Sequence, residues 1–224
     1  MEVKILGISG SYRKQSGTSV AVKRALEGAQ SIHVPVKTEF IALQGKNIGP
    51  CVHCDGCYRR RSTCIIQDDF QEVQEAFLEA DGYILGSPVY EMNYTPVMGA
   101  LLSRIRPVYL EYPGHFTRRA GAAIAAGGNR NGGQEMVLIN IQNFFNTNEI
   151  ITSGGTFHDP GGACLVTVDG SYEKALEDRQ GLNASYRVGQ RLAQTAALLK
   201  YGAESFASQG ISLIETKDWY DVEG

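Results

Sequence analysis

The sequence predicts an α/β protein in which helices cover both faces of an open, doubly wound parallel sheet. Two observations predict this class. Apolar β-forming runs alternate along the chain with stretches whose apolar residues recur at helical spacing, which is typical of parallel strands joined by crossover helices. The chain also has 224 residues and 43% hydrophobic content, which is enough for one well-buried domain and too little for a second full one.

The first strand and helix are the clearest elements. Residues 2–8 form a β-run, and Val22, Ala25, Leu26 and Ala29 then recur at i, i+3, i+4 and i+7, as on one face of a helix. The same alternation repeats four times. We expect further strands at 36–43, 83–87, 120–126 and 150–157, and further helices around 73–80 and 97–105 and over 133–146 and 183–200.

Residues 158–182, between the fifth strand and the last helix, are too long for a tight connection. An insertion that covers a site or makes a subunit contact and a plain surface excursion explain this length equally well. We therefore expect one domain over residues 1–201, which includes a cysteine-rich loop at 44–67 and the insertion at 158–182, followed by a tail at 202–224.

Composition argues against several classes of function. The net charge is −3 and no basic stripe is present, which argues against nucleic acid as a partner. The beginning of the sequence lacks the positive-then-apolar order of a secretory signal, and no apolar run approaches the roughly 20 residues that span a bilayer. We expect a cytoplasmic protein without a membrane partner.

In a reducing cytosol, clustered cysteines more often hold metal or do redox chemistry than form disulfides.

The loop from Gly7 to Ser19 has the composition of an anion site. It has neither the Walker spacing nor the G-x-G-x-x-G turn, but it interleaves hydroxyl residues with Gly10 and Gly17 directly before a helix. Hydroxyls can donate to phosphate oxygens, and a helix N-terminus adds unpaired N–H groups and a favourable dipole. Arg13 would add a charge-assisted bond. Ordinary turn and cap chemistry explains the same residues, so both interpretations stay open.

Two further loops would leave the same edge of the sheet, where open α/β sheets bind ligands. The loop from Gly86 to Pro96 offers the flat face of Tyr90, and the loop from Ala126 to Glu135 contains four glycines whose backbone can bend closely around a ligand. Core packing and a glycine-rich turn are the alternatives for each loop alone.

Together, the three loops resemble those of the NADPH-dependent FMN reductase branch of the flavodoxin-like fold, over about residues 1–157. The resemblance rests on S-G-S-x-R-K-x-x-G-T-S at 9–19, S-P-V-Y at 87–90 and G-G-N-R-N-G-G at 127–133. It implies a five-stranded sheet of order 2-1-3-4-5 and bound FMN. The FMN phosphate would lie at Ser9, Ser11, Arg13, Ser16, Gly17 and Thr18, and its ring would lie at Pro88, Val89, Tyr90, Asn93, Gly128, Asn129 and Arg130.

Four of the five cysteines lie in one short segment with the spacing C-x2-C-x2-C-x6-C: Cys51, Cys54, Cys57 and Cys64. Three thiolates separated by two residues each can surround one corner of a compact inorganic core, which favours a [4Fe–4S] cluster. Structural zinc usually takes two distant pairs, and thioredoxin-like chemistry needs one C-x-x-C. Zinc and free thiols stay open as alternatives. We expect Cys164 to be an ordinary buried cysteine and His53 not to be a ligand.

A flavodoxin-like domain with such a cysteine run after strand two resembles the iron–sulfur flavoprotein family. The resemblance implies FMN and a [4Fe–4S] cluster, electron transfer, and assembly as a homo-oligomer, either a dimer or a tetramer. In a 2-1-3-4-5 sheet the loops after strands one and two are neighbours, so we expect the two cofactor sites along one edge. Arg59, Arg60 and Arg61 would offset the cluster charge or steer an acidic carrier such as ferredoxin, and a solvated turn is the alternative.

Three functions remain at this point. The first is an electron-transfer oxidoreductase that passes electrons between a one-electron carrier such as ferredoxin and an acceptor through [4Fe–4S] and FMN. The second is an NAD(P)H-dependent FMN or quinone reductase with a structural metal at the cysteines. The third is a redox-sensing module without turnover. No Ser-His-Asp or paired-carboxylate arrangement is evident, so no acid/base catalytic residue is assigned.

Overall fold

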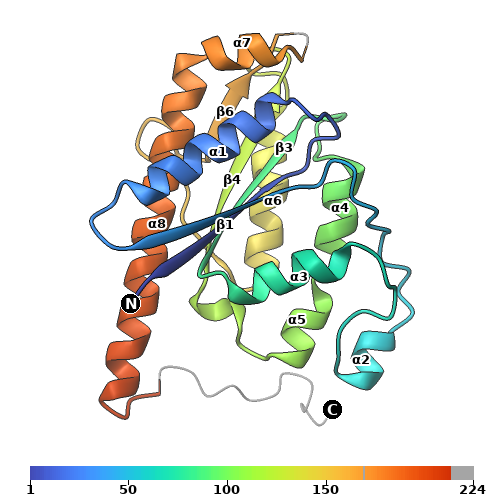
Figure 1. Cartoon of the computed structure of the whole chain (residues 1–224), viewed down its shortest axis with the longest axis vertical. Coiled ribbons are helices and arrows are strands. Elements are labelled where there is room, and N and C mark those ends of the chain that lie inside the picture. Colours follow the sequence, from blue (N-terminus) through green and yellow to red (C-terminus); the bar gives the residue numbers. More distant parts are fainter. Residues whose placement is uncertain (169, 213–224) are drawn as a thin grey trace.

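The structure is a computed structural model that describes residues 1–168 and 170–212. Its described part contains one parallel sheet with strands in the order β2-β1-β3-β4-β5, and β6 also pairs with β4 (Figure 1). The strands are β1 (Val3–Ser9), β2 (Val36–Ala42), β3 (Gly82–Pro88), β4 (Ala120–Gly127), β5 (Ile151–Thr152) and β6 (Ala163–Val166). This order confirms the flavodoxin-like fold and places the loops after β1, β3 and β4 at one edge.

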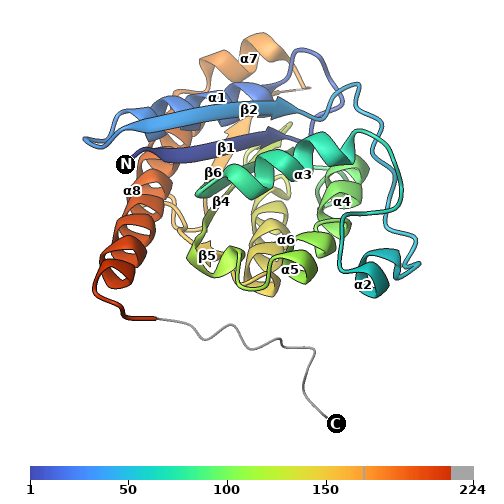
Figure 2. The same ribbon diagram turned by 60° about the horizontal axis from the view of Figure 1, so that its bottom comes forward.

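Helices cover both faces of the sheet, as Figures 1 and 2 show. One face packs against α1 (Gly17–Gln30) and α8 (Arg179–Ser208), and the other against α3 (Phe70–Glu79), α4 (Pro96–Ser103), α5 (Arg106–Glu111) and α6 (Gln134–Thr147). Two short helices, α2 (Gly56–Arg60) and α7 (Tyr172–Glu177), and one 3-10 turn, Phe116–Arg118, complete the described elements. No helix within the described residues is long and apolar enough to cross a membrane.

The two faces bury two separate apolar clusters, because successive side chains of a strand point to opposite sides of the sheet. Ile5 and Ile84 lie in the cluster under α1 and α8, whereas Leu6 and Leu85 lie in the cluster under α3, α4 and α6. The central strands are therefore apolar along their whole length, as parallel strands between two helical layers must be.

The fifth strand differs from the prediction. The expected strand at 150–157 is limited to β5, which pairs with the start of β4, while β6 pairs with Ile124–Gly127 at its end. Gly154 adopts a positive φ of 59° and Gly162 one of 126°, so the chain leaves the sheet and then returns. The segment 158–182 therefore contributes a strand and helix α7 to the domain and is not simply an insertion.

Two helices also have other bounds than the sequence suggested. The helix expected around 97–105 corresponds to α4, which ends at Ser103, and an additional helix, α5, follows from Arg106 with Pro107 in its first turn. The last helix runs from Arg179 to Ser208 and is capped by the Asp178 side chain, which accepts from the Gly181 N–H. Part of the expected tail at 202–224 is thus helical, and residues 213–224 lie outside the described residues.

Candidate functional site

The first loop carries a connected set of buried hydroxyls at the N-terminus of α1. Ser16 is the N-cap, and its Oγ accepts from the Ser19 N–H at 3.1 Å. Ser16 Oγ also lies 3.0 Å from Ser19 Oγ, which in turn lies 2.9 Å from Ser9 Oγ. Ser11 is buried as well and its Oγ accepts from the Arg13 N–H at 3.1 Å. The structure thus brings the predicted serines together at a helix N-terminus, where an anion is favoured.

Two residues expected at a phosphate face the protein interior instead. A Cβ on Gly17 would lie 2.4 Å from Thr167 Cγ2, so glycine is required for α1 to pack against the chain beyond β6. Thr18 is also buried, and its Cγ2 would lie 3.2 Å from a Cβ on Gly86. Any contribution of Gly17 to anion binding would therefore come from its backbone N–H group.

The guanidinium of Arg13 is engaged elsewhere in this structure. Its Nη1 donates to the carbonyl of Gly170 at 2.5 Å, and the pair is exposed to solvent. The contact joins the first loop to the segment before α7. Arg13 thus belongs to the predicted phosphate loop, but its guanidinium contacts the Gly170 carbonyl.

The second loop begins at Pro88, the last residue of β3. The Val89 N–H donates to the Ala126 carbonyl, and Tyr90 and Asn93 form an antiparallel bridge with hydrogen bonds of 2.8 and 2.9 Å. The Tyr90 ring is 45% exposed, and its centroid lies 6.1 Å from that of Tyr12. Tyr12 was not among the predicted site residues. Only its place in the first loop could have indicated it.

The third loop packs directly onto the second. A Cβ on Gly133, whose φ is 94°, would lie 2.6 Å from Met92 Sδ and 3.1 Å from Val89 Cγ1. The buried Gln134 fixes the loop, because its Nε2 donates to the Asn129 carbonyl and its Oε1 accepts from the Gly132 N–H, both at 2.7 Å. Gly128, Asn129 and Arg130 are exposed at the tip. The second and third loops therefore lie against each other.

Arg130 is also tied to the chain that follows β6. Its Nη2 donates to Asp178 Oδ1 at 2.7 Å, while Asp178 Oδ2 accepts from the Val166 N–H at the same distance. Asp178 thus links the third loop, β6 and the start of α8. Sequence reasoning did not find this residue, and its position before the last helix gave only a capping signal.

The cysteine loop starts where expected and then turns away. The Leu43 N–H donates to the Ser9 carbonyl, so the loop leaves the sheet beside the first loop. The cysteines, however, lie at the junction of α4 and α5: the Cys51 N–H donates to Ser103 Oγ at 3.2 Å, and Arg106 Nη1 donates to Asp55 at 2.6 Å. In Figures 1 and 2, α2 accordingly lies next to α5. The expectation that both sites share one edge is thus correct only for the start of the loop.

The four thiols are free but not gathered around a point. Cys51 and Cys54 are exposed, and Cys57 and Cys64 are half-buried. Within residues 1–168 and 170–212, no three His, Cys, Asp or Glu side chains are arranged to hold a metal. Burial raises the pKa of the Cys57 thiol.

The donor set nevertheless fits a metal or cluster. All four sulfurs belong to one loop, and His53 and Asp55 adopt positive φ values of 52° and 54°, which turn the chain sharply on either side of Cys54. Thiolates are soft ligands that suit iron–sulfur clusters and zinc. Cys164 lies on β6, outside this loop; it is half-buried, and burial raises the pKa of its thiol to about 11.

The arginine run in this loop serves the loop itself. Arg59 Nη2 donates to the Cys54 carbonyl at 2.7 Å, and Arg60 donates to the carbonyls of Gly56 and Thr63. The Arg61 guanidinium lies 5.6 Å from the centre of the Tyr58 ring. These side chains brace the turn while their charges stay exposed.

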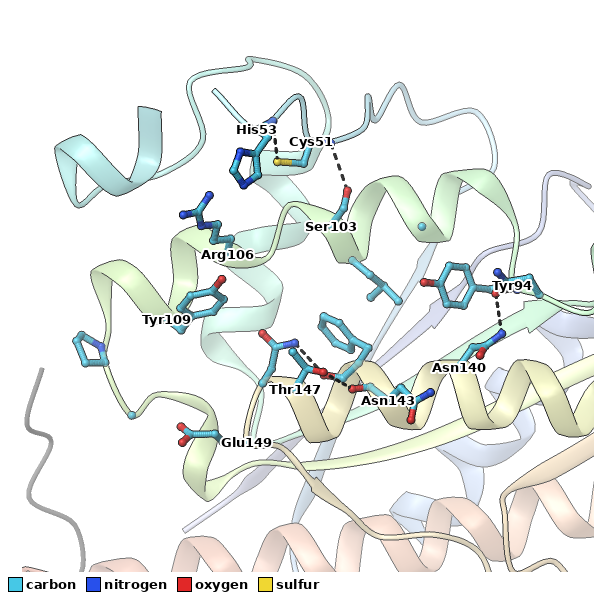
Figure 3. Close-up of a pocket in the computed structure, with 17 residues that line it drawn as sticks. Cys51, His53, Tyr94, Ser103, Arg106, Tyr109, Asn140, Asn143, Thr147 and Glu149 are labelled. Carbon is cyan, nitrogen blue, oxygen red and sulfur yellow. Dashed lines mark hydrogen bonds between the residues drawn. The ribbon is translucent and has the colours of Figure 1, made fainter. Parts of the chain in front are cut away.

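A groove joins the cysteine loop to the second loop. It has a volume of about 1000 Å³ and lies between α4 and α5 on one side and α6 on the other. Figure 3 shows Cys51 and His53 at one end, and Tyr94 and Asn140 at the other. Asn93, predicted at the ring, lines this groove, and its Oδ1 accepts from Asn140 Nδ2 at 3.0 Å. Cys51 and Asn93 thus line one cavity, and the other residues predicted at the ring are not among those that line it.

Comparison with known proteins supports the fold and identifies the family. The model of the family described as NADPH-dependent FMN reductase matches residues 3–162. The structure is also similar to a flavone reductase, with a TM-score of 0.63 and 20% identity, over 89% of this chain and 65% of that one, which supports the fold. The chain belongs to the NADPH-dependent FMN reductase family, a class of flavin-dependent oxidoreductases.

Relatives narrow the class further. Two iron–sulfur flavoproteins of Methanocaldococcus jannaschii are 40% and 34% identical to this chain. The first alignment covers 80% of this chain and 90% of the relative, and the second covers 88% and 100%. Within the reductase class, the chain belongs to the iron–sulfur flavoprotein family.

Proposed function

We propose that this chain is an electron-transfer iron–sulfur flavoprotein of the cytoplasm, which passes electrons between a one-electron carrier such as ferredoxin and an acceptor through [4Fe–4S] and FMN. One observation carries the proposal. In a chain of this family, the cysteine loop contacts one end of α4 through Cys51, and the first of the three candidate FMN loops contacts the other end through Gly10. When bound, a cluster exchanges single electrons and a flavin accepts one or two.

The first loop is proposed to hold the FMN phosphate. Ser9, Ser11 and Ser16 supply hydroxyls, and the N-terminus of α1 supplies N–H groups and a favourable dipole. Arg13 supplies a cation from the rim of the loop. The exposed contact of Arg13 with the Gly170 carbonyl leaves the side chain free to exchange partners at little cost.

The second and third loops are proposed to hold the isoalloxazine ring. Tyr12 and Tyr90 supply aromatic surface. Pro88, Val89 and Asn93, together with Gly128, Asn129 and Arg130, are the other proposed contacts. Because these loops pack on one another through Gly133, they present a preformed surface.

Cys51, Cys54, Cys57 and Cys64 are proposed to be the cluster ligands. The exposed arginines of the same loop offset the negative charge of a cluster and provide a basic surface for an acidic carrier. Assembly as a dimer or tetramer is part of the proposal and follows from the family resemblance.

The second candidate is an NAD(P)H-dependent FMN or quinone reductase with a structural metal at the cysteines, which the description of the matching family favours. Anaerobic mixing with reduced ferredoxin or with NADPH, while the flavin absorbance is followed, separates the two. Fast bleaching by ferredoxin and slow bleaching by NADPH support electron transfer through the cluster. Fast bleaching by NADPH alone contradicts it and supports the second candidate.

A further inference from the structure

The side chain of Arg104, directly after α4, is the most deeply buried charge near the cysteine loop. Its exposed fraction is 1%, and that of its partner Asp68 is 6%, with Arg104 Nη1 and Asp68 Oδ2 2.6 Å apart. Burial alone would raise the pKa of Asp68, but the hydrogen bond from Arg104 and those from two backbone N–H groups lower it below its ordinary value. The pair is therefore ionised and fixed.

The same guanidinium holds both arms of the cysteine loop. Its Nη1 donates to the Gly49 carbonyl at 3.1 Å, and its Nη2 donates to the Ile66 carbonyl at 2.9 Å. Gly49 lies two residues before Cys51, and Ile66 lies two residues after Cys64. One side chain thus closes the loop at its base, directly outside the four cysteines.

Other contacts keep the closure rigid. Asp68 Oδ2 also accepts from the Gly49 N–H at 2.9 Å, so the carboxylate and the guanidinium both bind the first arm. The centre of the Phe70 ring lies 4.4 Å from Arg104 Cζ, which fixes the plane of the guanidinium. Arg104 Nε is buried without a hydrogen-bond partner in the described part of the chain. This unpaired nitrogen adds to the cost of burying the cation.

We propose that Arg104 is the positioning residue of the cysteine loop: it closes the loop before any metal binds, so that the four thiols are held within reach of one another. The inference rests on the proposed function. Without Arg104, metal binding would have to bring the two arms together, and the entropy cost of closing the loop would weaken the metal affinity. Lysine cannot replace arginine here, because a point charge cannot donate in fixed directions to Asp68 and both carbonyls at once.

The test compares R104Q and R104K with the unchanged protein and with R187Q as a matched control. Arg187 pairs with Asp159 at the same distance of 2.6 Å, away from the cysteine loop, although its side chain is more exposed (35% against 1%). The first readout needs no metal: the rate of trypsin cleavage at Arg59, Arg60 and Arg61, located by mass spectrometry. The second is the rate of iron release to a chelator from anaerobically reconstituted protein, and the third is the thermal midpoint.

We expect both Arg104 variants to be cleaved in the loop, and to release iron, roughly tenfold faster or more, because the loop opens locally. R104K should have a higher thermal midpoint than R104Q, since lysine still balances the charge of Asp68. It should nevertheless release iron as fast as R104Q. R187Q should change neither loop readout. Iron retention by R104K equal to that of the unchanged protein would overturn the proposal, as would unchanged trypsin cleavage in R104Q. If the unchanged protein takes up no iron and sulfide, the proposed function fails, while the trypsin result still decides whether Arg104 closes the loop.

Discussion

Thr95 and Ser103 mark the two ends of helix α4 and join it to the two candidate cofactor sites. Thr95 Oγ1 donates to the Gly10 carbonyl of the first loop at 2.7 Å, and Ser103 Oγ accepts from the Cys51 N–H at 3.2 Å. At about 1.5 Å per residue, the eight residues of α4 separate these contacts by about 12 Å. One short helix therefore sets the spacing between the two sites within a chain.

The first prediction concerns Thr95, which is fully buried. T95V removes a hydroxyl that donates to Gly10 and caps α4 at the Met98 N–H, leaving both backbone groups unpaired. We expect a loss of about 1–3 kcal/mol in unfolding free energy and a roughly tenfold weaker FMN affinity, because the first loop loses its support. Iron content should not change. T195V, which removes an exposed hydroxyl on α8, is the control. Unchanged FMN affinity in a destabilised T95V would show that Thr95 does not position the loop.

The second prediction concerns Ser16, the N-cap of α1. S16A should lower stability by about 1 kcal/mol through loss of the cap. FMN affinity should fall by roughly tenfold, whereas the affinity for riboflavin, which lacks the phosphate, should stay the same. Titration of both ligands into metal-free protein measures this ratio. Equal losses for the two ligands would place the phosphate elsewhere.

The third prediction concerns the contact of Gly17 with Thr167. G17A places a Cβ against Thr167 Cγ2, and overpacking of this kind costs about 1–3 kcal/mol. T167S removes that methyl group and keeps the hydroxyl that donates to the Gly127 carbonyl at 3.1 Å. The double variant should therefore be more stable than the sum of the single changes by about 1 kcal/mol. Additive effects in denaturant unfolding would mean that the two residues do not touch.

The fourth prediction is a pH dependence caused by His115. Burial, and secondarily the charge of Arg119, lower its pKa from 6.5 to about 4, and its Nε2 is buried without a partner among the described residues. Between these values the unfolded chain binds a proton that the folded chain does not, so stability falls as the pH falls from 6.5 to 4. The full shift corresponds to about 3 kcal/mol, and partial exposure reduces the expected effect to about 1–2 kcal/mol.

H115Q isolates this contribution from that of the carboxylates. Its unfolding free energy should decrease less between pH 7 and pH 4.5 than that of the unchanged protein, by about 1 kcal/mol. Parallel curves for the two proteins would mean that folding does not lower the pKa of His115.

The fold was predictable because its signals are local. The strands from β1 to β4 begin and end within two residues of the predicted ranges, since apolar periodicity marks a buried strand regardless of its neighbours. The sequence did not predict that two strands, β5 and β6, both pair with β4 where one fifth strand was expected. This arrangement depends on Gly154 and Gly162, whose positive φ values could equally have served an ordinary turn.

The placement of the candidate site residues was predictable only in part. The serines and the three loops converge because parallel strands end at one edge. The contacts of the cysteine loop with Ser103, Arg104 and Arg106 were not predicted, because they join residues far apart in the sequence. No pattern in the sequence around Arg104 distinguishes a buried arginine from an exposed one.

The central claim is that one chain holds both a cluster and a flavin at separate sites. The most direct measurement is the content of iron, acid-labile sulfide, zinc and flavin per chain after anaerobic purification, for the unchanged protein and for C57S. We predict about four iron, four sulfide and one FMN with no zinc, and loss of iron but not of FMN in C57S. Stoichiometric zinc without sulfide, or loss of FMN together with iron in a folded C57S, would contradict the account.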